Sequence, residues 1–149
     1  MTVQIRPAWH ADLDQCVSLL EQLFRIESDF TANALRQTRG LQSLLETDGA
    51  RVLVADDDGQ VVGMLSVQRL VSTAEGAAVG LVEDVVVSAA RRGEGIGRAL
   101  LQAAEDWARR EGLARLQLLA DRDNLGALGF YQRRGWRTTR LVAMRLMLR

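Results

Sequence analysis

The residues whose types and spacing most clearly suggest a functional site lie in the run VVVSAARRGEGIGRALL, residues 85–101. In this run a β-branched stretch ends and a helical pattern begins. Free backbone N–H groups and the helix dipole favour an anion at the start of a helix. Gly95 and Gly97 would let the backbone approach that anion closely, because they carry no side chain. Three flanking arginines add positive charge: Arg91, Arg92 and Arg98. This spacing predicts a site for a phosphorylated ligand, with an ordinary glycine-rich turn as the alternative.

Two common phosphate-binding motifs do not fit this run. A Walker A loop needs Lys followed by Ser or Thr, and the sequence contains no Lys. The dinucleotide pattern G-x-G-x-x-G also fails, because a glycine is missing at its last position in either register, at Arg98 or at Leu100. The sequence therefore excludes the usual P-loop NTPase and disfavours a Rossmann domain.

The second candidate group is a pair of carboxylates just before this run. Glu83 and Asp84 lie in the β-rich stretch AVGLVEDVVV, and strand alternation sends their side chains to opposite faces. Glu83 is expected on the same face of the strand as Val85 and Val87 unless a bulge intervenes. One of the two carboxylates is therefore expected to face a cleft.

The other reactive residue types indicate structural roles. Cys16 lies in an apolar helical stripe and is interpreted as a buried thiol rather than a nucleophile. His10 stands alone, and residues 56–59, DDDG, lack the ligand spacing of a calcium loop. We predict no bound metal, and the arginines show no motif that favours nucleic acid.

The composition is that of a globular domain. The 149 residues are 48% hydrophobic and 26% charged, which predicts one domain over residues 1–149. No apolar run is long enough to span a membrane, no secretory signal is apparent, and a single Cys excludes an internal disulfide, so we expect a cytoplasmic protein. Residues 1–90 hold 6 Arg against 13 Asp or Glu, and residues 91–149 hold 13 Arg against 6. This asymmetry favours a phosphorylated ligand for the second half and a cationic one for the first.

The periodicity predicts alternating strands and helices that position these residues. Strands are predicted at 2–6, at 51–70 as a hairpin around Asp57, Asp58 and Gly59, at 78–87, at 114–120 and at 141–149, and helices at 12–26, 32–46, 95–111 and 124–134. A hairpin region followed by a β-α-β unit indicates an α/β or α+β domain with a mixed sheet.

Two motifs carry a resemblance to a known family. The stretch from Arg92 to Gly97 matches the Q/R-x-x-G-x-G/A signature of the GNAT superfamily of acetyl-CoA-dependent N-acetyltransferases. The later stretch NLGALGFYQRRGW is similar to a second motif of the family, with five residues at its spacing: Asn124, Ala127, Phe130, Tyr131 and Gly135. The resemblance implies a GNAT-like fold, with a mostly antiparallel, twisted sheet of 6–7 strands splayed into a V and flanked by about four helices.

The resemblance also implies how acetyl-CoA, the acyl donor, would bind. Its pyrophosphate would lie beside Arg92 on the backbone N–H groups of Gly93, Glu94, Gly95, Ile96, Gly97 and Arg98. Its pantetheine arm would pair with the strand edge at Val85, Val86 and Val87, whose unpaired backbone groups can satisfy its amides. The family motif further places Asn124 and Tyr131 at the coenzyme.

For catalysis, the resemblance places Tyr131 at the family's general-acid position near the coenzyme sulfur. Glu83 is the first candidate for the general base, directly or through a water, whereas Asp84, Asp121 and a water chain remain open alternatives. Some members carry an acidic residue at the position of Leu119, so this chain departs from that pattern.

The function predicted from these residues is direct transfer of an acetyl group from acetyl-CoA to a primary amine of a small molecule or a peptide N-terminus. The acceptor segments of the family correspond to residues 24–36 and 69–80, whose Glu27, Asp29 and Glu75 predict a cationic acceptor. The alternative is a non-catalytic acyl-CoA-binding or interaction module. Many members of the family form a homodimer through the closing strand. Whether this chain does so is left open by the sequence.

Overall fold

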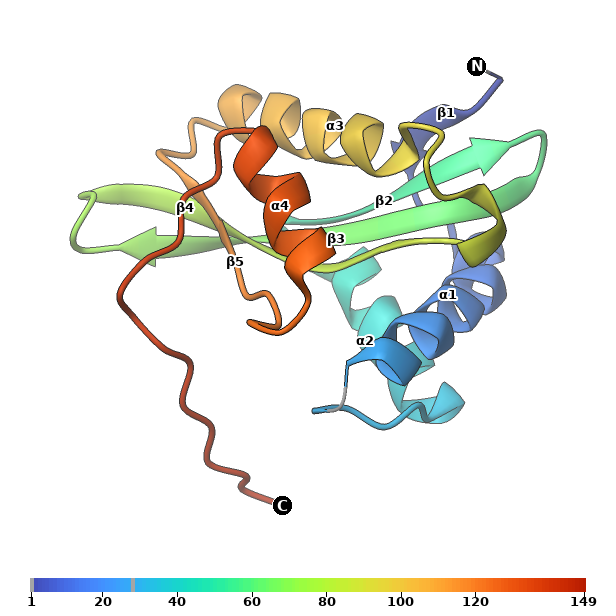
Figure 1. The fold of residues 1–149 in the computed structure, drawn as a ribbon, viewed down its shortest axis with the longest axis horizontal. Helices are drawn as coiled ribbons and strands as arrows, with labels where there is room; N and C mark the ends of the chain where they lie inside the picture. Colours follow the sequence, from blue (N-terminus) through green and yellow to red (C-terminus); the bar gives the residue numbers. More distant parts are fainter. Residues whose placement is uncertain (1, 28) are drawn as a thin grey trace. The chain divides into compact units, whose positions relative to one another are not determined.

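The computed structural model describes residues 2–27 and 29–149 as two compact units, Met1–Leu118 and Leu119–Arg149 (Figure 1). The first unit holds the sheet and three α-helices, and the second holds one helix. The single domain expected over residues 1–149 stays a prediction.

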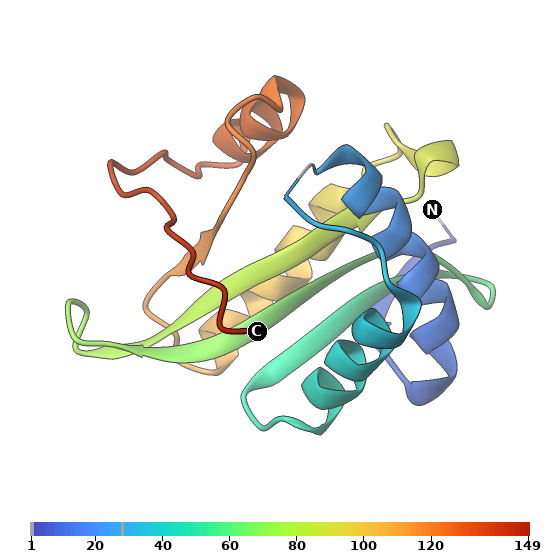
Figure 2. The same cartoon turned by 90° about the horizontal axis from the view of Figure 1, so that it is seen from below.

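The first unit is built on a five-stranded mixed sheet with the order β1-β2-β3-β4-β5 (Figure 2). The strands are β1 (Gln4–Pro7), β2 (Ala50–Asp57), β3 (Gln60–Ser72), β4 (Ala77–Val87) and β5 (Leu116–Leu118). Neighbours from β1 to β4 pair antiparallel, and β4 pairs with β5 in parallel. The predicted hairpin is confirmed, and its turn places Asp58 and Gly59 at φ +51° and +91°.

The described residues contain five strands, so the prediction of 6–7 strands is wrong. The predicted closing strand at 141–149 is the main difference, because residues 137–149 are not in strand conformation. The segment has an apolar pattern, but a strand also needs a neighbour for its backbone N–H and C=O groups. Its large apolar side chains are exposed, with 84% of Leu141 and 92% of Met144 accessible to solvent.

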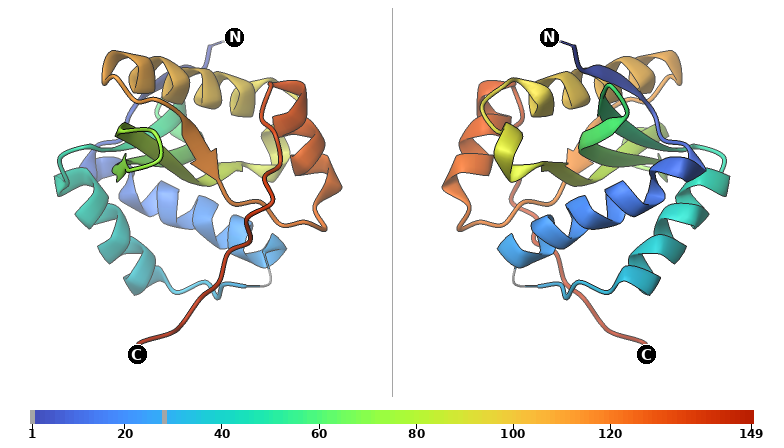
Figure 3. Two further views of the ribbon diagram at one scale, coloured as in Figure 1. Left: turned by 90° about the vertical axis from the view of Figure 1, so that its left-hand side faces the viewer. Right: turned by 90° about the vertical axis from the view of Figure 1, so that its right-hand side faces the viewer.

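Helices cover both faces of the sheet of the first unit (Figure 3). Two of them, α1 (Leu13–Ile26) and α2 (Ala34–Glu46), contact each other and pack on one face, while α3 (Ile96–Arg110) packs on the other. These bounds confirm the three helices expected from their apolar stripes. The α1 stripe buries Leu13, Cys16, Leu19, Leu20 and Leu23.

The start of α1 is fixed by a buried carboxylate. Asp12, only 5% exposed, accepts hydrogen bonds from both terminal nitrogens of the Arg6 guanidinium at 2.8 and 3.0 Å and from the Trp9 backbone N–H at 2.6 Å. The guanidinium also donates to Asp56 of β2 at 3.0 Å. Arg6 holds the pKa of Asp12 below its usual value, because it stabilises the charged form. This network ties α1 to the sheet.

Close packing at one glycine sets the position of α3. A Cβ atom at Gly63 of β3 would lie 3.1 Å from both Ile96 Cγ2 and Leu100 Cδ1. These two side chains are almost completely buried. The absence of a side chain at Gly63 therefore lets the first turns of α3 approach the sheet closely.

The second unit contains α4 (Leu125–Arg133), which matches the helix expected at 124–134. The Asn124 side chain caps it by accepting a hydrogen bond from the Ala127 backbone N–H at 3.1 Å. Tyr131 lies in this helix next to Phe130 and Trp136, with ring centroids 5.4 and 5.9 Å away. An aromatic cluster thus holds the Tyr131 ring.

Candidate functional site

The loop that joins β4 to α3 has the conformation that the glycines predict. Gly93 and Gly95 adopt φ values of +82° and +83°, which are strained for any other residue type. A Cβ atom at either position would meet no described heavy atom within 4 Å, so both backbones face open space. Gly95 is the N-cap residue of α3, which begins at Ile96, and it provides no side-chain cap. The first turn of α3, which includes Gly97, can therefore offer its N–H groups to an anion.

The arginines around this loop have different roles. Arg91 is partly buried and donates to Asp57 at 2.7 Å and to Glu94 at 2.9 Å. These bonds connect the loop to the end of β2, and Arg91 lowers the pKa of Asp57. Arg92 and Arg98 are exposed at the loop and at the first turn of α3. They are therefore better placed than Arg91 to meet a ligand's phosphates.

The strand β4 offers an open backbone edge before this loop. Its parallel pairing with β5 covers only Gly80, Leu81 and Val82. Among the described residues, the remaining part of β4, Glu83–Val87, pairs with β3 alone. The edge at Val85–Val87 is thus available for an extended ligand, as the resemblance implies.

A β-bulge interrupts β4 at the two carboxylates. Ser66 of β3 pairs with Glu83, whereas Met64 pairs with Val86, so one extra residue is inserted on β4. Directly paired residues share a face of the sheet, which places Glu83 with Val86. The exception stated for Glu83 therefore applies: a bulge intervenes, and Glu83 does not share a face with Val85 and Val87.

The bulge holds Asp84 in an unusual conformation. Asp84 has a φ of +57°, in the left-handed region that non-glycine residues seldom adopt. The buried Ser66 hydroxyl donates to the Glu83 carbonyl oxygen at 3.3 Å, next to this residue. Ser66 is therefore a positioning residue that sequence reasoning missed. A serine among apolar residues of a buried strand is the signal that points to it.

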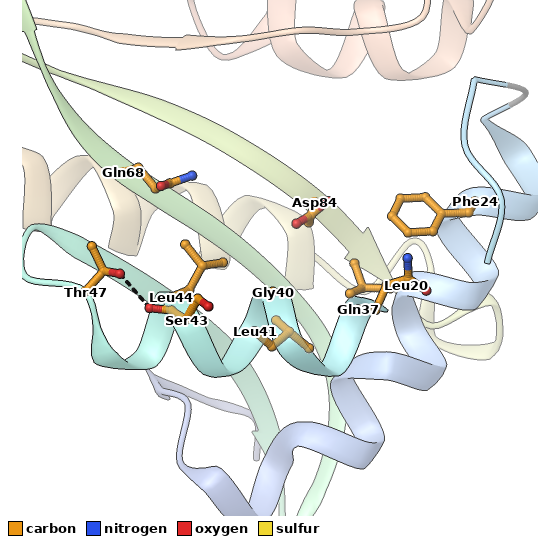
Figure 4. Close-up of a pocket in the computed structure, with 10 residues that line it drawn as sticks. All are labelled: Leu20, Phe24, Gln37, Gly40, Leu41, Ser43, Leu44, Thr47, Gln68 and Asp84. Atoms are coloured by element: carbon orange, nitrogen blue, oxygen red, sulfur yellow. Dashed lines mark hydrogen bonds between the residues drawn. The ribbon is translucent and has the colours of Figure 1, made fainter. Parts of the chain in front are cut away.

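Asp84 borders a cavity of about 380 Å³ between α1, α2, β3 and β4 (Figure 4). The lining residues are Leu20, Phe24, Gln37, Gly40, Leu41, Ser43, Leu44, Thr47, Gln68 and Asp84. Burial, together with the negative charges of Glu83 and Glu27, raises the pKa of Asp84 to about 6. Asp84 is thus a carboxylate that can take up a proton near neutral pH, whereas Glu83 is exposed.

The acidic residues expected to serve the acceptor are in different environments. Glu27, at the end of α1, is close enough to Asp84 to influence its pKa. Glu75 lies at the β3–β4 turn, where its carboxylate is 3.4 Å from Arg115. The predicted acceptor segment 24–36 includes residue 28, which lies outside the described residues. Glu75 is therefore an ion-pair partner at the other end of the sheet.

The structural role expected of Cys16 is confirmed. Cys16 is fully buried, and burial raises the pKa of its thiol to about 12. Asp121, in the second unit, accepts a hydrogen bond from the Asp123 backbone N–H at 2.9 Å in an exposed turn. Over residues 2–27 and 29–149, no three His, Cys, Asp or Glu side chains gather as a metal site would require. No helix in the same ranges is long and apolar enough to cross a membrane.

Comparison with known proteins decides the family. A model of the acetyltransferase (GNAT) family matches residues 14–136, most of the chain. This chain belongs to the GNAT family. The match includes both motifs, from the glycine loop to Trp136, and the predicted mixed α/β architecture agrees with it.

Several known proteins are similar to this chain over much of its length. The uncharacterized protein YxbD of Bacillus subtilis (strain 168) is 32% identical over 102 residues, which are 68% of this chain and 58% of YxbD. The chain therefore spans less than two thirds of that relative. The aminoalkylphosphonate N-acetyltransferase of Salmonella typhimurium is 29% identical over 134 residues, 90% of this chain and 84% of that protein. A solved structure described as a transcriptional regulator from Bacillus halodurans C-125 has a TM-score of 0.88 at 26% identity and covers 97% of this chain and 99% of its own.

The first unit fits the acetyl-CoA that GNAT proteins use as acetyl donor. The open space at Gly93 and Gly95 lets a phosphate approach the backbone closely. The edge of Val85–Val87 leads directly into this loop along the chain. Asn124 and Tyr131 belong to the second unit, so their parts in coenzyme binding and catalysis stay predictions.

Proposed function

We propose that this GNAT protein is an acetyl-CoA-dependent N-acetyltransferase that transfers acetyl directly to a primary amine of a small molecule or a peptide N-terminus. The observation that carries the proposal is the position of Asp84. This carboxylate borders a cavity and is followed immediately by the open edge of β4 and then by the glycine loop. The name of the Salmonella relative, an N-acetyltransferase, supports an amine acceptor.

In this proposal Asp84, rather than Glu83, is the general base. A primary amine is mostly protonated at neutral pH and must lose a proton before it can attack a thioester. A carboxylate with a pKa of about 6 is deprotonated at pH 7 and can take that proton through a hydrogen bond or one water. The exposed Glu83 adds negative charge close to the acceptor.

Two further groups complete the proposed chemistry. Acetyl-CoA supplies the acetyl thioester, whose carbonyl can be polarised by a backbone N–H at Val85 or Val86. Tyr131, the only Tyr in the sequence, is proposed to donate its phenolic proton to the departing thiolate. No covalent intermediate with the protein is required.

The first experiment measures free thiol release from acetyl-CoA with a panel of primary amines, with calorimetric acetyl-CoA binding in parallel. Amine-dependent release is expected. A Tyr131→Phe variant is expected to lose about 100-fold or more in turnover while it keeps its affinity for acetyl-CoA. Binding without release from any amine would instead favour a non-catalytic acyl-CoA-binding module.

We also propose that the chain forms a homodimer through residues 141–148. Exposed apolar side chains in such a segment favour an interaction partner. Light scattering should give a dimer mass for the full chain and a monomer mass after deletion of residues 140–149. A monomeric full chain at micromolar concentration would contradict this.

A further inference from the structure

The wall of the cavity beside Asp84 defines what kind of amine fits. Helices α1 and α2 present four large apolar residues to it, namely Leu20, Phe24, Leu41 and Leu44. Figure 4 shows Asp84 entering from β4 on the side of Phe24 and Leu20, whereas Gln68 and Thr47 lie toward the other side. The cavity therefore combines one carboxylate with an apolar wall and a few neutral polar groups.

From this wall we infer that the acceptor is a primary monoamine with an apolar body and no anionic group. The inference rests on the proposed function and specifies its substrate class. A body of aryl or alkyl carbon would lie against the leucines and Phe24, and its ammonium group would lie at Asp84. A cavity of about 380 Å³ suits a small molecule of this kind.

The charges around the cavity support a cation and oppose an anion. Asp84 lines the cavity, and the charges of Glu83 and Glu27 are close enough to raise its pKa. Among the described lining residues none is basic, so a carboxylate or phosphonate on the acceptor would face acidic groups without a cationic partner. An amine that also carries an anion should therefore bind less well than the same amine without it.

The apolar wall opposes acceptors with several charges or many hydroxyl groups. A polyamine has a second ammonium group, and an aminoglycoside has several polar groups in all directions. Against Leu41 and Leu44 these groups would lose water without gaining a hydrogen bond. The neutral polar groups near Thr47 are already partly used, because the Thr47 hydroxyl donates to the Ser43 carbonyl at 2.5 Å.

Phe24 is the side chain best placed to recognise the apolar body. It projects from the last turns of α1, and its ring packs against Phe30 with a centroid distance of 5.4 Å and a tilt of 48°. This contact favours one ring orientation at the cavity. Phe24 is thus a specificity-determining residue for this acceptor class.

The test compares kcat/KM for thiol release with phenethylamine, phenylalanine, aminomethylphosphonate, spermidine and tobramycin. Phenethylamine and phenylalanine differ only by a carboxylate, so their ratio isolates the effect of the anion. We expect phenethylamine to exceed each of the others by about tenfold or more. A higher value for phenylalanine, aminomethylphosphonate, spermidine or tobramycin would overturn the inference.

A pair of variants tests the wall itself. Phe24→Ala should lower kcat/KM for phenethylamine about tenfold or more. The kcat/KM for methylamine should change less than about threefold, because methylamine has no apolar body to bind. The matched control is Leu35→Ala on α2, because Leu35 is 71% exposed and does not line the cavity. Equal losses for both amines in Phe24→Ala would show that the wall does not select the acceptor.

Direct binding separates this inference from the proposed function. If no amine releases thiol although acetyl-CoA binds, the proposed function fails, and calorimetry of the protein with CoA and each amine then decides the inference. Tighter binding of phenethylamine than of phenylalanine and spermidine would still support the cavity's specificity. Absence of phenethylamine binding would overturn it.

Discussion

The two halves of β4 have similar strand-forming sequences but different surroundings. Ala77–Val82 pairs with β3 along its length and with β5 at its end, and a Cβ at Gly80 would meet three neighbouring side chains. The half from Glu83 to Val87 contains the bulge and, among the described residues, has one partner strand. Pairing on both sides from Gly80 to Val82 makes the first half a packed part of the sheet. Incomplete pairing leaves the second half with a carboxylate and backbone groups that a substrate can use.

The largest effect is expected at the bulge. Asp84→Asn should lower kcat/KM for amine acetylation about 100-fold or more, because an amide cannot accept the proton. The wild-type rate should rise with pH through about 6, where Asp84 loses its proton, and the variant should lack that rise. Glu83→Gln is the matched control, and less than a threefold loss is expected because Glu83 is exposed. A larger loss in Glu83→Gln than in Asp84→Asn would reverse the assignment.

A substitution in the first half of β4, Ala77–Val82, should change the stability of the fold rather than the catalytic rate. A Cβ at Gly80 would lie 2.5 Å from Leu116 Cδ2 and 3.2 Å from both Leu113 Cδ1 and Val67 Cγ2. Gly80→Ala should therefore lower the free energy of unfolding by about 1–3 kcal/mol in urea titrations. Gly40→Ala is the control, because a Cβ there meets no described heavy atom within 4 Å and Ala favours the helix. A Gly80→Ala variant as stable as wild type would show that β5 shifts at little cost to accommodate the added methyl group.

The pH dependence of stability gives a further contrast. The folded state raises the pKa of Asp84 to about 6, so it favours the neutral carboxyl. That contribution is fully present below about pH 4, the unfolded pKa, and is lost as the pH rises through about 6. Urea midpoints between pH 4 and pH 7 should therefore fall for the wild type relative to Asp84→Asn. Parallel profiles would show that Asp84 is as well solvated in the folded chain as in the unfolded one.

The smallest effects are expected from two buried serines of β3. Ser66 bonds the Glu83 carbonyl at the bulge, and the Ser72 hydroxyl accepts from the Glu75 backbone N–H at 3.2 Å near the β3–β4 turn. Each Ser→Ala change should cost about 1 kcal/mol of stability. Only Ser66→Ala should also lower kcat, about threefold to tenfold, and move the pH at which the rate rises, because the base is displaced. Equal kcat values and equal pH profiles in the two variants would show that Ser66 does not position the base.

Much of this arrangement could be predicted where a local pattern determines the structure. The apolar stripes of α1 and α3 and the turn at Asp58 and Gly59 depend on neighbours in sequence, and the structure matches them. The conformation of the glycine loop was also predictable from local sequence, because Gly93 and Gly95 have positive φ angles, which glycine adopts readily. In these regions, sequence periodicity and residue type were sufficient.

Prediction was wrong where the outcome depends on another segment. The bulge changes the face of Glu83, and it exists because Ser66 and Met64 of β3 pair with residues three positions apart on β4. Strand alternation within β4 carries no information about this register. The closing segment has a suitable apolar composition, but a partner strand decides whether it pairs. The cavity beside Asp84 also combines α1, α2, β3 and β4, which no single motif contains.

The burial of Cys16 has a practical use in following this protein. It is the only sulfhydryl of the chain, is completely shielded by α1 and the sheet, and its high pKa keeps it in the unreactive protonated form. A chromogenic disulfide reagent should therefore report coenzyme release with almost no background from the protein. The slow residual labelling of Cys16 would measure how often α1 lifts away from the sheet. Because α1 also lines the cavity beside Asp84, an amine bound there should slow that labelling, so the same reagent would record occupancy as well as turnover.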